Sequence, residues 1–174
     1  MKILILNGSP RQGNTVAAIE ALKTGIGTNH QVEVVDTYKL QVAPCKACDV
    51  CQCENDCIDQ DDTHYIVDKM MDADMLVFCT PVYWCGISAQ LKLIIDKCYS
   101  KHKLMHGKKT GCIAIGAEPA SHPLYENIMA QFAHNEDYLS WEPVFKKYYS
   151  AWAANELAEN QAVLDQLTAL GQEL

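Results

Sequence analysis

Five of the nine cysteines lie in one short stretch, PCKACDVCQCENDC at residues 44–57, where their thiols could do redox or metal chemistry. The spacing C-x2-C-x2-C-x5-C is formed by Cys45, Cys48, Cys51 and Cys57, whereas Cys53 falls outside it. Four thiolates in so short a loop can hold a [4Fe–4S] cluster. The other interpretations are free thiols, a structural zinc ion, whose ligands usually come as two more widely spaced pairs, and disulfides.

A second candidate site is the turn NGSPRQGNT at residues 7–15, between a short apolar run and an amphipathic stretch. A helix beginning there would present free backbone N–H groups and positive partial charge to a phosphate. Further donors would come from Ser9, Asn14 and Thr15, and a positive charge from Arg11. Gly13 would let the ligand approach the backbone closely. The turn matches neither GxGxxG nor a Walker loop, which leaves a monophosphate such as that of FMN. A plain helix cap is the alternative.

A third candidate site is the aromatic loop TPVYWCG at residues 80–86. Tyr83 and Trp84 supply flat rings against which an isoalloxazine can stack. Pro81 stiffens the turn, Gly86 allows a ligand to approach the backbone, and the N–H groups of the loop could bond the pyrimidine edge of a flavin. The alternative is a pair of aromatic core residues at the end of a strand.

Alternating apolar and amphipathic segments must position these sites. Strands are predicted at residues 2–7, 31–36, 75–81, 111–117 and 142–150. Helices are predicted at residues 15–26, 87–101, 123–134 and 155–174, with a short one that follows the capping residues 61–63 and runs to about residue 71. The alternation indicates an α/β fold, a flavodoxin-like doubly wound five-stranded parallel sheet of order 2-1-3-4-5 with helices on both faces. In that order the first and third strands are neighbours, so the phosphate loop and the aromatic loop would lie side by side.

The 174 residues predict one domain, residues 1–174, with a long cysteine-rich connection at about residues 38–61. A net charge of −8 argues against partners such as nucleic acid and anionic membranes. No apolar run approaches the roughly 20 residues that span a bilayer, and no signal peptide is recognised. The protein is therefore expected in the cytoplasm, where thiols stay reduced.

Several remaining residues have more ordinary interpretations. We expect Cys79, Cys98 and Cys112 to be small buried residues, because they fall on strand or helix patterns. Cys85 is expected to be a packing residue, with a reactive thiol as the alternative. Lys92 and Asp96 are expected to form a solvated ion pair or a packing contact at a subunit interface. The strand that contains Pro143 is expected at the edge of the sheet.

These motifs resemble the NADPH-dependent FMN reductase family, and most closely the branch that includes the iron–sulfur flavoproteins. The resemblance rests on GSPRQGNT, PCKACDVC, the Asp61-Asp62 pair and PVYW followed by LKLIID. It covers the whole chain in element order, with its motifs in residues 3–98.

The resemblance implies three sets of FMN contacts. The phosphate would be held by the residues named above in the turn at residues 7–15, and the ring by Pro81, Val82, Tyr83, Trp84 and Gly86. A third contribution would come from Gly116, Ala117 and Glu118. The resemblance also implies a homodimer or homotetramer, with the flavin near a subunit interface. Relatives that bind FMN alone can keep the same cysteines, so their spacing does not separate a cluster from free thiols.

The sequence thus predicts an FMN-containing NAD(P)H-dependent oxidoreductase that passes electrons to a flavin, quinone or similar acceptor. The flavin would carry the chemistry, so no side chain is expected to be indispensable as acid, base or nucleophile. A second hypothesis is an iron–sulfur flavoprotein that carries electrons between protein partners such as ferredoxin, without direct nicotinamide oxidation. A third is a zinc-stabilised binding module without redox activity.

Overall fold

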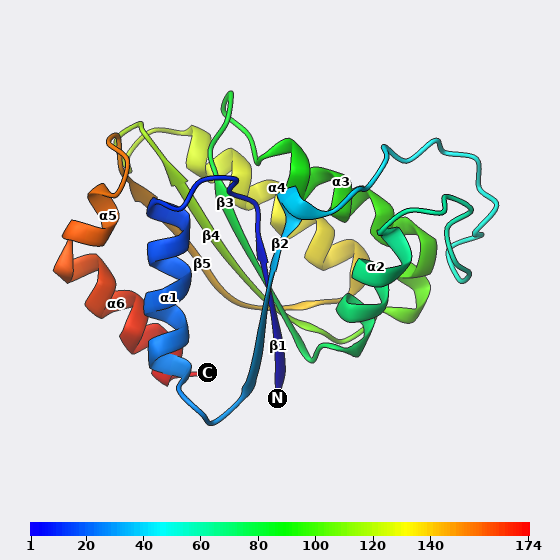
Figure 1. Cartoon of the computed structure of the whole chain (residues 1–174), viewed down its shortest axis with the longest axis horizontal. Coiled ribbons are helices and arrows are strands. Elements are labelled where there is room, and N and C mark those ends of the chain that lie inside the picture. The colour runs from blue at the N-terminus through cyan, green and yellow to red at the C-terminus, as the bar shows by residue number, and fades with distance from the viewer.

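The computed structural model describes residues 1–174 as a single five-stranded sheet between two layers of helices (Figure 1). Its strands are β1 (Lys2–Asn7), β2 (Gln31–Asp36), β3 (Met75–Pro81), β4 (Lys109–Gly116) and β5 (Glu142–Ser150). All neighbouring strands are parallel and their order is β2-β1-β3-β4-β5, which confirms the predicted flavodoxin-like topology. Pro143 lies on β5 at the edge of the sheet, as predicted, close to a register irregularity between Thr110 and Gly111.

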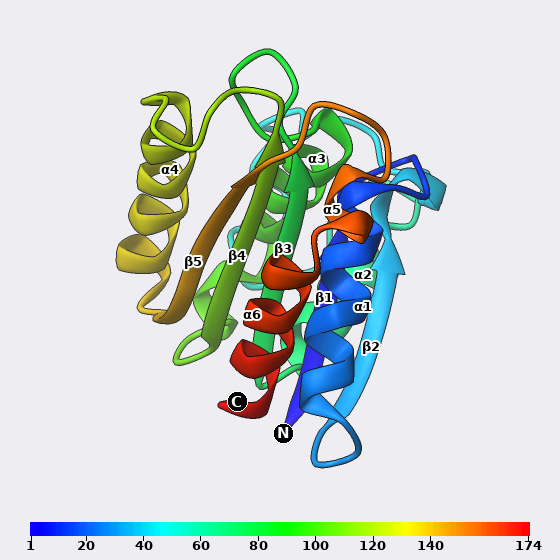
Figure 2. The ribbon, with the colours of Figure 1, turned by 90° about the vertical axis from the view of Figure 1, so that its left-hand side faces the viewer.

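Helices cover both faces of the sheet. They are α1 (Asn14–Ile26), α2 (Thr63–Asp72), α3 (Ala89–Lys97), α4 (Leu124–Leu139), α5 (Glu156–Glu159) and α6 (Gln161–Gln172), with 3₁₀ turns η1 (Thr37–Lys39) and η2 (Cys98–Leu104). Helices α1, α5 and α6 lie on one face, and α2, α3 and α4 lie on the other (Figures 1 and 2).

The prediction of one closing helix over residues 155–174 is wrong. The chain breaks at Asn160, whose φ of −95° and ψ of 85° are not helical. The side chain of Asn160 accepts a hydrogen bond from the backbone N–H of Val163 and so caps α6.

The sheet separates two apolar cores because side chains alternate along each strand. On β1, Leu4 and Leu6 belong to the core beneath α2, α3 and α4, whereas Ile3 and Ile5 belong to the core beneath α1 and α6. Every residue of β3 is buried. This two-sided burial is typical of a parallel sheet and explains why the strands read as continuous apolar runs.

Two glycines allow α1 and α6 to pack with their backbones in close contact. A Cβ atom on Gly25 would lie 1.9 Å from the carbonyl oxygen of Thr168, and one on Gly171 would lie 2.3 Å from that of Leu22. Both obstacles are backbone atoms, which cannot rotate away. Any side chain at either position would therefore push the two helices apart.

We expect Gly25→Ala to lower the free energy of unfolding by about 3 kcal/mol, because overpacking forces the backbone to shift. Urea denaturation followed by circular dichroism measures this change. The neighbouring exposed substitution Thr24→Ala is the control and should change stability by less than about 0.5 kcal/mol. Equal stability of the two variants would contradict the close packing of α1 against α6.

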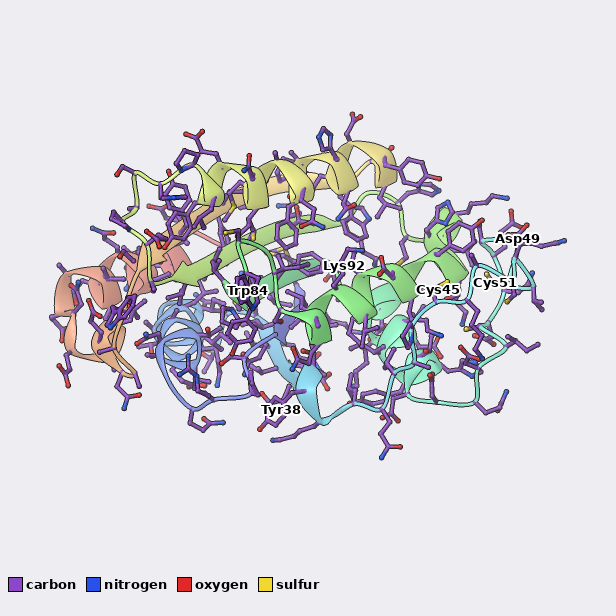
Figure 3. All side chains as sticks on the ribbon, turned by 90° about the horizontal axis from the view of Figure 1, so that it is seen from above. Tyr38, Cys45, Asp49, Cys51, Trp84 and Lys92 are labelled. Atoms are coloured by element: carbon purple, nitrogen blue, oxygen red, sulfur yellow. The ribbon has the colours of Figure 1, made fainter.

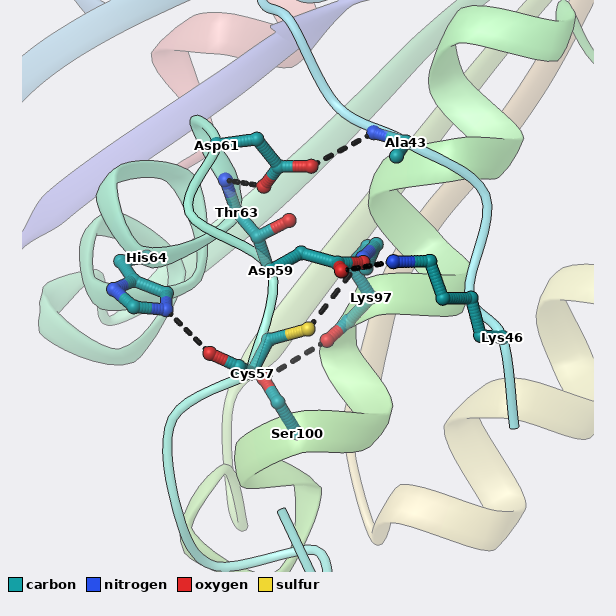
Figure 4. Close-up of polar contacts among 9 residues, drawn as sticks. All are labelled: Ala43, Lys46, Cys57, Asp59, Asp61, Thr63, His64, Lys97 and Ser100. Carbon is teal, nitrogen blue, oxygen red and sulfur yellow. Dashed lines mark hydrogen bonds and ion pairs between the residues drawn. The ribbon is translucent and has the colours of Figure 1, made fainter. Parts of the chain in front are cut away.

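The long connection at residues 40–62, between η1 and α2, is fastened at its two ends (Figure 4). The carboxylate of Asp61 accepts hydrogen bonds from the backbone N–H groups of Ala43 and Thr63, both at 2.9 Å. Asp62 accepts a bond of 2.7 Å from the N–H of Gln41. The acidic pair therefore closes the base of the loop as well as starting α2. None of the helices has the length and apolar character needed to cross a membrane.

Candidate functional site

The loop after β1 is shaped by polar contacts with its neighbours. Asn7 is only 1% exposed; its amide nitrogen donates to Asp36 at 2.9 Å and its amide oxygen accepts from the N–H of Ser9 at 3.0 Å. The hydroxyl of Ser9 accepts from the N–H of Arg11 at 3.2 Å. These bonds fix the turn before any ligand arrives. They also engage the Ser9 hydroxyl, which was predicted as a phosphate donor, in shaping the loop.

The N-terminus of α1 opens directly from this loop and has no side-chain cap. The first backbone bond of the helix runs from the N–H of Ala17 to the carbonyl of Gly13, so the N–H groups of Asn14, Thr15 and Val16 have no protein acceptor. Thr15 is 3% exposed, and its hydroxyl bonds to no other protein group. Free donors and the positive end of the helix dipole therefore face the same space.

This space is a cavity of about 190 Å³ at the carboxyl ends of four strands, bounded by the loops after β1, β3, β4 and β5. It is lined by Ser9, Arg11, Gln12, Gly13, Asn14, Thr15, Pro81, Val82, Tyr83, Ile115, Gly116, Ala117, Ala151, Trp152, Ala154 and Asn155. Arg11 is the only charged residue among them, and no carboxylate lines the cavity. In a chain of net charge −8, a cavity with only positive charge is suited to a bound anion.

All but three of the predicted FMN-binding residues line this cavity; Trp84, Gly86 and Glu118 do not. Trp84 is fully exposed at the tip of a two-residue turn, in which its φ is 47° and that of Cys85 is 60°. Tyr83 and Gly86 close the turn with backbone bonds of 2.9 and 3.0 Å. Cys85 is exposed at the tip, so its expected packing role is wrong. Glu118 lies outside the lining, and its carbonyl accepts a hydrogen bond of 2.8 Å from the hydroxyl of Tyr125.

The loop after β5 forms a wall that the sequence analysis missed. Asn14 holds it: the amide nitrogen donates to the carbonyl of Ala153 at 2.9 Å, and the amide oxygen accepts from the N–H of Leu157 at 3.0 Å. The Asn14 side chain thus fastens the wall, and its backbone N–H remains free for a phosphate. Trp152, 82% exposed, borders the cavity from this loop. Trp152 follows the carboxyl end of a parallel strand, and this position could have indicated that it borders a ligand site.

We expect Asn14→Ala to reduce FMN affinity about tenfold and to lower the free energy of unfolding by about 1–2 kcal/mol, because the hydrogen bonds to the loop after β5 and to the start of α5 are lost. Fluorescence titration with FMN and urea denaturation of the flavin-free protein measure the two effects. Asn127→Ala, an exposed position on α4, is the matched control. If Asn14→Ala bound FMN as the control does, the loop after β5 would not be part of the site.

The cysteine stretch forms a second, narrower cavity. Its lining includes all four in-register cysteines, Cys45, Cys48, Cys51 and Cys57, but not Cys53. No group of three or more His, Cys, Asp or Glu side chains converges there closely enough to hold a metal ion. The donor set still fits an iron–sulfur cluster in its chemistry, since four thiols share one cavity. Cys45 and Cys48 are exposed, Cys57 is half-buried and Cys51 is buried.

The two cavities are separate in the chain. No residue lines both of them. In Figure 3, which looks onto the molecule from above, Cys45 and Cys51 lie at one end beyond α3, while Trp84 lies near the middle. The cysteine connection leaves the same edge of the sheet as the other loops but then extends along the outer side of α2 and α3 (Figure 1).

The three cysteines predicted in strands and helices, and the ion pair predicted on α3, are found as expected. Cys79, Cys98 and Cys112 are 0%, 4% and 1% exposed, which confirms them as buried residues. Burial raises the pKa of all three thiols, that of Cys98 to about 12, so they stay protonated. Lys92 and Asp96 form the predicted pair along α3.

A larger cavity, about 280 Å³, lies between α3 and α4. Phe78, Phe132 and Trp141 contribute aromatic rings to it, and the exposed rings of Tyr99 and Tyr138 lie at its border. No free helix N-terminus opens into it, and its lysine, Lys92, is already paired. We therefore assign the anion site to the cavity at the strand ends, although it is the smaller of the two.

The chain is similar to known proteins in sequence and in fold. Residues 1–133 match the NADPH-dependent FMN reductase family. An iron–sulfur flavoprotein of Methanocaldococcus jannaschii is 34% identical over 121 residues, which are 67% of this chain and 63% of that protein. A protein of Bacillus subtilis named as an NAD(P)H-dependent FMN-containing oxidoreductase is 33% identical over 98 residues, 56% of this chain and 51% of that protein.

The chain spans between about half and just under two thirds of the length of the curated relatives it matches. Among solved structures, an NAD(P)H:quinone oxidoreductase from Methanothermobacter marburgensis superimposes with a TM-score of 0.79 at 16% identity. That alignment covers 99% of this chain and 98% of the other. At this identity the similarity establishes a shared fold.

Proposed function

The chain belongs to the NADPH-dependent FMN reductase family, and we propose that it is an FMN-containing oxidoreductase that takes electrons from NADH or NADPH. It passes them to a flavin, a quinone or a similar acceptor. The observation that carries this proposal is the cavity at the strand ends, where an uncapped helix N-terminus, Arg11 and an aromatic loop meet without a carboxylate.

The residues present fit FMN and divide its parts among them. Arg11, the hydroxyl of Thr15 and the free N–H groups of α1 would hold the phosphate. The segments Pro81–Tyr83 and Gly116–Ala117, which line the same cavity, would border the ring. When bound, FMN supplies the redox chemistry, and the protein contributes binding, orientation and electrostatics. We accordingly assign no residue the role of acid, base or nucleophile.

The backbone around the ring site is held close by packing. A Cβ atom on Gly116 would lie 2.8 Å from the hydroxyl oxygen of Tyr125 and 3.0 Å from Cβ of Val82. That hydroxyl donates to the carbonyl of Glu118 at 2.8 Å and so anchors the loop after β4. Burial raises the pKa of Tyr125, which keeps this donor protonated. Glycine at position 116 therefore lets the loops after β3 and β4 meet where the ring would be bound.

For the cysteine cavity we propose a [4Fe–4S] cluster held by Cys45, Cys48, Cys51 and Cys57. Two observations support this assignment: the four in-register thiols share one cavity that excludes Cys53, and several curated relatives are named iron–sulfur flavoproteins. The backbone turns of this loop use left-handed residues, with φ of 52° at Ala47 and 57° at Asp49. Such turns direct N–H groups toward an enclosed anion.

We place the protein in the cytoplasm, because a cluster of reduced cysteines needs a reducing compartment. We also propose that it forms a homodimer or homotetramer. The exposed rings of Tyr99 and Tyr138 beside the cavity between α3 and α4 support an interface there. The acceptor is a small molecule or a redox protein such as ferredoxin.

Steady-state oxidation of NADH and NADPH by the FMN-loaded protein, with free FMN or a quinone as acceptor, tests the proposed activity. We expect turnover that depends on both the nicotinamide and the acceptor. Protein that holds FMN but oxidises neither nicotinamide would instead act as an electron carrier between proteins. Colourless protein that holds zinc and no flavin would point to a binding module.

A further inference from the structure

One lysine is buried against the cysteine cavity (Figure 4). The side chain of Lys97, at the end of α3, is 1% exposed. Its ammonium lies 3.4 Å from Sγ of Cys57 and 2.6 Å from a carboxylate oxygen of Asp59. Burying a lysine is costly unless its charge is compensated, so its position beside a cysteine sulfur calls for an explanation.

The ion pair with Asp59 does not account for the whole arrangement. Asp59 also pairs with Lys46, at 2.5 Å, and Lys46 is 65% exposed. The three side chains therefore carry two positive charges and one negative charge, with Lys97 on the inner side. One positive charge is left over among these three side chains, and the sulfur of Cys57, 3.4 Å from the ammonium of Lys97, can carry a negative charge.

We propose that Lys97 is a positioning residue for the cysteine cavity: its buried ammonium donates an N–H···S bond to the ligating sulfur of Cys57 and favours the reduced state of the cluster. This inference rests on the proposed [4Fe–4S] cluster. With four thiolate ligands, one-electron reduction of the cluster adds one negative charge, takes up no proton and breaks no bond. A nearby buried cation stabilises that added charge, and hydrogen bonds to sulfur are known to set cluster potentials.

Two further hydrogen bonds hold Cys57 and Lys97 in place beside each other. The carbonyl of Cys57 bonds to the ring Nε2 of His64 at 2.6 Å, so the backbone at the ligand is fixed from α2. The hydroxyl of Ser100 donates to the carbonyl of Lys97 at 3.0 Å. Lys97 reaches the sulfur from inside the fold, whereas Lys46 approaches Asp59 from solvent. This difference makes Lys46 a matched control with the same charge and the same carboxylate partner.

The test uses full-length protein reconstituted anaerobically with iron and sulfide. Iron is counted per chain, and the cluster is titrated with dithionite while its electron paramagnetic resonance signal is followed. For Lys97→Met we expect the equilibrium constant for one-electron reduction to fall at least tenfold, a shift of about 59 mV to lower potential. Lys97→Arg should restore most of the shift, and Lys46→Met should change the constant less than about twofold, because solvent screens its charge.

Circular dichroism and FMN affinity establish that each variant is folded, since the flavin cavity shares no residue with this one. If Lys97→Met does not fold, Lys97→Gln keeps a neutral donor to Asp59 and is expected to show the same direction of shift. An unchanged reduction constant in the folded variant, or an equal shift in Lys46→Met, would overturn the role of Lys97 while leaving the cluster in place. Wild-type protein that takes up no iron would overturn the cluster, and this inference with it.

Discussion

The double substitution Arg11→Ala, Thr15→Val is expected to weaken FMN binding at least about 100-fold. Each change removes a donor to a doubly charged phosphate, and hydrogen bonds to charged groups contribute about 1.5–3 kcal/mol each. Losing both costs at least about 3 kcal/mol, and every 1.4 kcal/mol is tenfold in the dissociation constant. The free N–H groups of α1 remain in the variant, so residual binding is expected at high FMN concentration.

Flavin fluorescence titration of the flavin-free protein measures this loss. Lys23→Ala is the control, because it removes a positive charge from the opposite end of α1, where Lys23 pairs with Glu20. The control should bind FMN within about twofold of the wild type. If the double variant kept its flavin through purification as the control does, the phosphate would lie elsewhere and the assignment of the cavity at the strand ends would be wrong.

The second large effect is expected at the cysteine cavity, where Cys57→Ser should abolish most iron binding. Wild-type protein reconstituted without oxygen is expected to hold about four irons per chain, as a four-thiolate ligand set allows. Replacing one ligand sulfur by a hydroxyl removes a thiolate, and the remaining three are expected to retain less than about half of the iron. Iron analysis and the broad visible absorbance that dithionite bleaches report this change.

Cys53→Ser is the matched control for this prediction. Cys53 lies in the same loop but outside the cavity that the four in-register cysteines line. It should leave both iron content and absorbance unchanged, and both variants should keep FMN. Equal iron content in the wild type and in both variants would contradict the assigned ligand set, and bound zinc in place of iron would support a structural site.

Strong periodic patterns made most of the fold predictable. Buried parallel strands appear in the sequence as continuous apolar runs. When amphipathic helices connect such strands, only a few strand orders are compatible with short, right-handed connections. The sequence therefore predicted the strand order, and β5 was placed at residues 142–150 with the bounds that the structure has. The break at Asn160 was not predictable from periodicity, because the apolar stripe continues through it. A local cap at Val163 decides where α6 begins.

The candidate site was predictable where one loop acts alone and not where distant segments meet. The turn after β1 and the start of the aromatic loop line the cavity as expected. The role of the Asn14 side chain depends on Ala153 and Leu157, which are far away in sequence. The burial of Lys97 could not be predicted from the sequence either, because a lysine on a helix is normally exposed. It is buried because the cysteine connection folds back over the end of α3.

The most direct test of the proposed function is the visible spectrum of the purified protein in the absence of oxygen, before and after addition of NADPH or NADH. We predict a bound-flavin spectrum in the starting protein and loss of the flavin absorbance on mixing with at least one of the two nicotinamides. Protein without flavin absorbance after incubation with FMN, or bound flavin that neither nicotinamide bleaches, would contradict the assignment as an FMN-containing NAD(P)H-dependent oxidoreductase.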